Sequence, residues 1–192
     1  MVGTAKVDPF AKKITNKIKV RAPWLLTTFI GGLFSAYILN QFQSSITDFS
    51  TVLFFIPFVL GISGNVGLQG STVIVRGLAT GDIQKDNILT VVRSELIVGI
   101  ANGIIFGFLC GFIITLIAAP ILQTSPLLGP AVGLGIVLAV GVAAVIGSTA
   151  PIIFLRINVD PAISSGPFVT VTNDIAGIAI YLLTTSYFYS AI

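Results

Sequence analysis

The sequence predicts an all-α integral membrane protein with five transmembrane helices. Apolar residues make up 55% of the 192-residue chain and charged residues only 9%, whereas a soluble domain carries about 25% charged residues. Residues 96–155 contain no charged side chain, which leaves room for two helical spans of roughly 20 residues each. The apolar runs do not alternate with polar residues as the strands of a transmembrane barrel do, so we expect the spans to be helices.

Polar or proline-containing segments separate the expected spans. Asp48 is the only charged residue between Arg21 and Arg76 and lies in the polar break between the first two spans. Prolines and a glycine between positions 120 and 130 separate the third span from the fourth, because proline disrupts a continuous helix. A last apolar stretch follows Asp160. The expected spans are 23–41, 51–76, 95–119, 127–155 and 163–190.

The basic residues predict the orientation. All ten Lys and Arg residues precede the first span or lie in the second or the fourth connection. Five spans place these segments on one side, which the positive-inside rule makes cytoplasmic. We therefore expect a multi-pass protein of the plasma (inner) membrane, with its N-terminus inside and its C-terminus outside. Residues 1–22 form a basic cytosolic segment, in which Pro9–Arg21 is expected to be an interfacial helix attracted to anionic lipid, with a gating role as the alternative. The net charge of +3 is read as topology, and no nucleic-acid partner is expected.

Small residues recur every four positions in the third and fourth spans. Such ladders let helix backbones approach closely in lipid, so they either hold the bundle together or form a dimer seam. Glu95 opens the third span, where it either favours the helix N-terminus electrostatically or adds negative charge at the inner mouth. The two ladders are Gly99, Gly103, Gly107 and Gly111, and Gly135, Ala139, Ala143 and Gly147.

The second span becomes small and polar after an apolar start, in the run GISGNVGLQGSTVIVRG. Asn65, Gln69 and Thr72 lie on roughly one helical face. Amide groups without partners are costly in lipid. They therefore make hydrogen bonds between helices, or they line a polar path whose oxygens coordinate hard cations.

The fifth segment, NVDPAISSGPFVTVTNDIAG, contains the strongest functional candidate. Asp160 and Pro161 are typical of a helix start, with Asp160 as the N-cap. Gly166–Pro167 invites a kink or break within the membrane. Asp174 follows about two turns deeper, and intramembrane acids usually face a pathway or a partner. Its face carries further small or polar residues, namely Gly166, Thr170 and Gly177, with Asn173 beside it.

An intramembrane enzyme is the rival from another class. The chain has no histidine, so a serine protease would lack its usual base. An aspartyl protease needs two facing carboxylates that share a proton. Asp160 and Asp174 would lie roughly 20 Å apart on one helix, so no enzyme is expected. A purely structural scaffold would leave Asp174 unexplained.

Two long segments resemble a known family. GNVGLQGSTVIVRGLATGDI and DPAISSGPFVTVTNDIAGIAIY are similar to the signature segments of the MgtE magnesium channel and transporter family. The APWLL opening of the first span and the RSELIVG opening of the third also fit. The resemblance covers the chain from about Arg21 to its end.

The resemblance implies a homodimer of five-helix subunits, with a cation path along the dimer axis lined by the second and fifth helices. The family's pore aspartate falls on Asp174, although Val171 replaces the usual threonine of that motif. The family's G-N-x-G asparagine falls on Asn65, and the D-P-A aspartate on Asp160. Bacterial members usually carry cytosolic regulatory domains. Because residues 1–22 alone precede the first span, either a short member or an excised membrane domain is expected, without feedback through such domains.

The expected function is passive conduction of Mg²⁺ through a channel-like pore. Magnesium keeps several waters and binds through one or two carboxylates, so two Asp174 side chains across a dimer axis would hold a largely hydrated ion. The alternative is a proton- or sodium-coupled exchanger of divalent cations, since a single buried acid also serves proton relays. Selectivity among divalent cations is not predicted. The candidate metal-binding residues are Asp174, Asn65, Thr170, Asn173, Gly166 and Asp160.

Overall fold

The computed structural model describes residues 14–44, 46, 49–84 and 86–190, and those residues form helices and connecting turns without a strand. Five helical stretches are long and apolar enough to cross a membrane, which confirms the predicted class. The helices are α1 (Ile14–Phe42), α2 (Phe49–Leu53), α3 (Ile56–Thr80), α4 (Ile88–Ile113), the π-helical η1 (Ile114–Ala118), α5 (Ala119–Leu122), α6 (Leu128–Arg156) and α7 (Pro161–Ser190).

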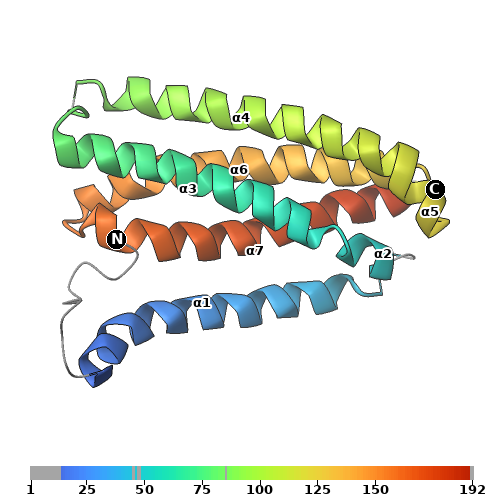
Figure 1. Cartoon of the computed structure of the whole chain (residues 1–192), viewed down its shortest axis with the longest axis horizontal. Coiled ribbons are helices and arrows are strands. Elements are labelled where there is room, and N and C mark those ends of the chain that lie inside the picture. Colours follow the sequence, from blue (N-terminus) through green and yellow to red (C-terminus); the bar gives the residue numbers. More distant parts are fainter. Residues whose placement is uncertain (1–13, 45, 47–48, 85, 191–192) are drawn as a thin grey trace.

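The long helices lie side by side along the long axis of the molecule (Figure 1). Helix α6 is the most buried, and it packs against α3, α4 and α7. Helix α1 packs on α7 and is the most exposed of the five. Its described part continues from the basic segment into the first span without interruption, through Pro23.

The glycine ladder of α4 packs directly on α6. Its four glycines are buried. A Cβ placed on Gly107 would lie 2.7 Å from the carbonyl oxygen of Gly133, and one on Gly111 would lie 3.0 Å from that of Gly129. The small residues of the α6 ladder are also buried within the subunit, where Gly135 meets Tyr181 of α7. Both ladders therefore hold the bundle together, which is the first of the two roles predicted for them.

The predicted interruption between the third and fourth spans is present at residues 123–127 but begins later than expected, and the predicted break in the fifth span is absent. The third span continues through Pro120 to Leu122, because η1 widens the helix just before the proline and the amide of Ala119 bonds to the carbonyl of Ile114. This wide turn accommodates a ring that would clash in a regular α-helix. Helix α7 likewise continues through Pro167, so the expected break at Gly166–Pro167 is wrong.

The connection between α3 and α4 is a compact turn. Gly81 ends α3 with a φ of 79°, a left-handed conformation that glycine adopts without steric cost. The amide of Ile83 then donates to the carbonyl of Gly77 at 2.9 Å, and the Ile83 side chain packs on that glycine. Helix α4 starts at Ile88, about two turns before Glu95.

Candidate functional site

Asp174 lies near the middle of α7, about 20 Å along the helix from its start at Pro161. Its side chain is half-buried. Within the described part of the chain it makes no hydrogen bond and no ion pair. A carboxylate at this depth is costly unless it meets water, a cation or a partner, so the subunit alone leaves this group uncompensated.

The packing of α7 shows which side Asp174 faces. Val171, three residues before it, meets Gly31 of α1, and a Cβ on Gly177, three residues after it, would lie 3.3 Å from the hydroxyl oxygen of Ser63 in α3. Residues three apart share one side of a helix. The carboxylate therefore lies on the side of α7 between α1 and α3.

Asn173 points into the subunit, where α3, α6 and α7 meet. Its side chain is 1% exposed, and neither its Oδ1 nor its Nδ2 has a hydrogen-bond partner. A Cβ on Gly67 would overlap Nδ2 and would lie 3.1 Å from the carbonyl oxygen of Ala143. Successive helical residues point about 100° apart, so Asn173 is turned toward the core while its neighbour Asp174 is not.

Asn65 lies on the exposed face of α3. It comes two residues before Gly67, which packs against α7, and two helical residues differ by about 200° in direction. Asn65 therefore points away from α7, and one subunit does not bring it to Asp174. Gln69 and Thr72 share this exposed face, which we call the polar face of α3.

The remaining candidates lie on the first half of α7. The Thr170 hydroxyl donates to the carbonyl of Gly166 at 2.9 Å. Because α7 is unbroken here, the helix is not opened to expose carbonyls to an ion, as the predicted kink would have done. Asp160 is exposed, and its Oδ1 accepts the amide of Ala162 at 2.9 Å, which confirms its predicted role as the helix cap.

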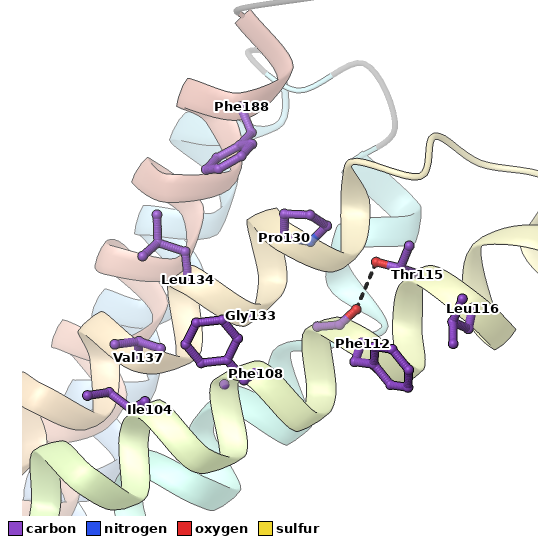
Figure 2. Close-up of a pocket in the computed structure, with 12 residues that line it drawn as sticks. Ile104, Phe108, Phe112, Thr115, Leu116, Pro130, Gly133, Leu134, Val137 and Phe188 are labelled. Carbon is purple, nitrogen blue, oxygen red and sulfur yellow. Dashed lines mark hydrogen bonds between the residues drawn. The ribbon is translucent and has the colours of Figure 1, made fainter.

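The larger of two cavities in the described part of the chain has almost entirely apolar walls. It has a volume of about 610 Å³ and lies between α4, α6 and the end of α7. Figure 2 shows its aromatic and aliphatic walls, with Phe108 and Phe112 on α4, Leu134 on α6 and Phe188 on α7. The Thr115 hydroxyl at its edge donates back to its own helix, to the carbonyl of Gly111 at 2.8 Å. Nothing in these walls replaces the water shell of an ion.

A second, much smaller cavity was missed by the sequence analysis. It lies between α3, α4 and α6 and is lined by Gln69, Glu95 and Asn102. Asn102 gave no signal in a glycine-rich apolar run, although it comes seven residues after Glu95 and therefore shares its helical face. Within the described part of the chain, no three His, Cys, Asp or Glu side chains gather as a metal cage.

The fold and the site define a multi-pass α-helical membrane protein with an ionisable group in mid-span. The chain belongs to the MgtE family, because residues 56–184 match that family's model, which is described as a divalent cation transporter. It is similar to the magnesium transporter MgtE of Bacillus subtilis, with 33% identity over 88% of this chain and 37% of that protein. It is also similar to the magnesium transporter MgtE of Thermus thermophilus, with 35% identity over 84% of this chain and 35% of that protein. The chain thus spans about a third of the length of these relatives.

Proposed function

We propose that this chain forms the membrane part of a divalent cation transporter, that Mg²⁺ is its substrate, and that Asp174 is the principal ion-binding group. The observation that carries the proposal is the half-buried Asp174 carboxylate, which has no partner within the described subunit. The relatives, which are named magnesium transporters, support the choice of ion.

We infer that the working unit is a homodimer with the path along its two-fold axis. The polar face of α3 is uncovered in the subunit, and amide groups facing lipid without partners would be costly. A second copy would enclose this face in a water-filled path and bring two Asp174 carboxylates together. A two-fold interface needs only one kind of surface, presented by both subunits.

In this arrangement the chain binds the ion without stripping its water. Two Asp174 carboxylates match the charge of one Mg²⁺, which keeps most of its waters. Asn65 and Thr170 offer amide and hydroxyl oxygens to those waters, and the Asn173 amide, aimed at α3, positions the helix pair. Asp160 and the Gly166 carbonyl lie toward the cytoplasmic end of the path. Binding stays weak enough for the ion to leave.

Passive conduction and coupled exchange predict different driving forces. A pore moves Mg²⁺ down its electrochemical gradient, so uptake into liposomes holding the purified chain follows an imposed membrane potential. In an exchanger of the alternative kind, uptake follows a proton or sodium gradient instead. Uptake that requires such a gradient and ignores the potential contradicts the pore.

The site assignment is tested by replacing the two acids of α7 separately. Asp174→Asn keeps the size of the side chain but removes its charge. One carboxylate charge about 4 Å from a divalent ion contributes about 8 kcal/mol at an effective dielectric of 20. Mg²⁺ uptake into liposomes should therefore fall at least tenfold, while the protein stays folded. Asp160→Asn is the matched control and should lose less. The assignment is wrong if Asp174→Asn conducts like the parent while Asp160→Asn is inactive.

A further inference from the structure

The small cavity between α3, α4 and α6 is a second place where charge meets an enclosed space. Its volume is about 20 Å³. Gln69 and Gly70 of α3 line one side, and Glu95 and Asn102 of α4 line the other. Glu95 is the only titratable or charged side chain in the lining, and α6 contributes only Ala144. The cavity lies near the middle of α3, at Gln69 and Gly70. Figure 1 shows α3 and α4 side by side from the turn that joins them.

The Glu95 carboxylate is directed into this space. A Cβ added to Gly70 would lie 3.9 Å from its Oε2 and 3.8 Å from the backbone nitrogen of Ser148 in α6. The carboxylate therefore lies over the backbone of α3 at Gly70, and the missing side chain of that glycine leaves room beside it. Glu95 is half-buried and has no hydrogen bond or ion pair with any described residue.

The lining side chains offer oxygen ligands. Carboxylate and side-chain amide oxygens are the ligands that hard cations take, and Gln69, Glu95 and Asn102 supply one such group each. A bound proton would need only the carboxylate, whereas a metal cation would also use the two amides that line the cavity. The nearest basic residue along α4, Arg93, is exposed and points about 200° away from Glu95, so it does not neutralise this acid.

Size and charge decide which cation fits. A cavity holds one water when the centre of a water-sized sphere can move through about 10–15 Å³. Here that space is about 20 Å³, which is enough for one water or one bare ion. Magnesium with its several waters needs several times the space of one water, and Mg²⁺ sheds those waters reluctantly. The single negative charge of Glu95 also balances one positive charge rather than two.

We propose that Glu95, Gln69 and Asn102 form a binding site for one monovalent metal cation, held without its full hydration shell and distinct from the site at Asp174. Binding neutralises Glu95 and ties α3 to α4. Gln69 belongs both to this site and to the polar face of α3, so an occupied site fixes the position of that face. The proposal does not depend on which ion the Asp174 path carries.

The test is the thermal unfolding of the purified full chain in detergent, with a chelator present to remove divalent ions. Sodium, potassium and lithium chloride are compared with choline chloride at one pH and one ionic strength. A ligand that binds only the folded state raises the unfolding midpoint in a saturable way. At one hundred times its dissociation constant, the expected rise for a chain of this size is roughly 5–10 °C. The absence of any such rise with all three metal ions overturns the proposal.

Two variants test the site by different routes. Glu95→Gln removes the charge at nearly constant size, and Gly70→Ala fills the cavity while leaving the carboxylate, because its new Cβ meets nothing closer than 3.8 Å. Both should lose the metal-dependent rise. Two control variants should keep the metal-dependent rise. One is Asp174→Asn, and the other is Gly61→Ala on the same helix as Gly70, where the new Cβ would meet nothing within 4 Å. This test measures stability, whereas the Asp174 proposal is tested by Mg²⁺ uptake. Either proposal can therefore fail while the other stands.

Three outcomes contradict the site. One is a full metal-dependent rise of the unfolding midpoint in Gly70→Ala. This variant also decides the question if Glu95→Gln does not fold. Another is a rise in the unfolding midpoint produced by Mg²⁺ in the absence of the chelator, if Glu95→Gln loses this rise and Asp174→Asn keeps it. The cavity would then hold a divalent ion. In the third, acid raises the unfolding midpoint of the parent but not of Glu95→Gln in choline chloride alone, and metal ions add nothing to this rise. The occupant would then be a proton.

Discussion

Replacing Gly67 with alanine tests the junction at which α3, α6 and α7 meet. The new methyl group would overlap Nδ2 of Asn173 and would lie 3.1 Å from the carbonyl oxygen of Ala143. The amide can rotate away, but the carbonyl belongs to the backbone of α6 and cannot. Overpacking of this kind costs about 1–3 kcal/mol, and the better helix propensity of alanine offsets up to about 1 kcal/mol. We expect Gly67→Ala to lower the free energy of unfolding by about 1–2 kcal/mol.

Removing the Asn173 amide should cost much less. Both of its polar atoms are buried without a partner, and such burial costs about 1–3 kcal/mol. Asn173→Ala removes that penalty and loses some packing, so we expect a change near zero. In the double variant, the methyl group on residue 67 occupies the space that the amide leaves. The two changes should therefore couple favourably by about 1 kcal/mol.

The assay is reversible unfolding of the four proteins of this cycle in detergent. Gly61→Ala is the matched control, because its Cβ would meet nothing within 4 Å. It should leave stability unchanged or slightly raised. If the effects of Gly67→Ala and Asn173→Ala add to within about 0.5 kcal/mol, the two residues are not in the contact described.

Three further predictions follow from contacts and topology. Tyr181→Phe should cost about 1 kcal/mol of unfolding free energy, because its buried hydroxyl donates to a carbonyl of α2 at 2.8 Å; an unchanged midpoint in detergent contradicts that bond. Gly107→Val should separate α4 from α6 and lower the free energy of unfolding by at least about 1–3 kcal/mol. The control Gly141→Val, with open space around it, should lower it little. Equal losses of stability would show that the α4–α6 contact is not tight. In an otherwise cysteine-free chain, a cysteine at Ser125 should be labelled from outside intact cells and one in the 82–87 turn should not, and the reverse pattern would overturn the inferred orientation.

The features read correctly from the sequence are those that depend on local composition. Charge-free runs of sufficient length predict the spans, because burial in lipid allows few charges. A residue at every fourth position shares one helical face, so the ladder from Gly99 to Gly111 predicts a close helix contact, and the structure shows that the partner helix is α6. Asp160 before Pro161 predicts a helix start, since capping involves only neighbouring backbone amides.

The features that the sequence did not predict depend on neighbours distant in the chain. Asn173 was grouped with Asp174 because the two are adjacent, yet a rotation of about 100° sends one into the core and leaves the other half-exposed. Glu95 was placed at the start of a helix because polar residues precede it. The structure instead starts α4 at Ile88, and only the packing of α3 against α4 reveals the cavity beside this acid.

Helix α3 connects the stability of the subunit with the need for a partner. Its core side is built from small residues such as Ser63 and Gly67, which let α6 and α7 approach its backbone. Its opposite side carries the exposed amides of Asn65 and Gln69, the second at the edge of the cavity beside α4. In water those amides would be solvated, but in lipid each would lose several kilocalories per mole of hydrogen bonding. A second copy that covered this side would remove that cost, which supports the proposed homodimer independently of the family resemblance. Substitutions on the two sides of α3 should therefore have different effects. Those on its core side should change folding, and those on its polar face should change assembly and ion passage.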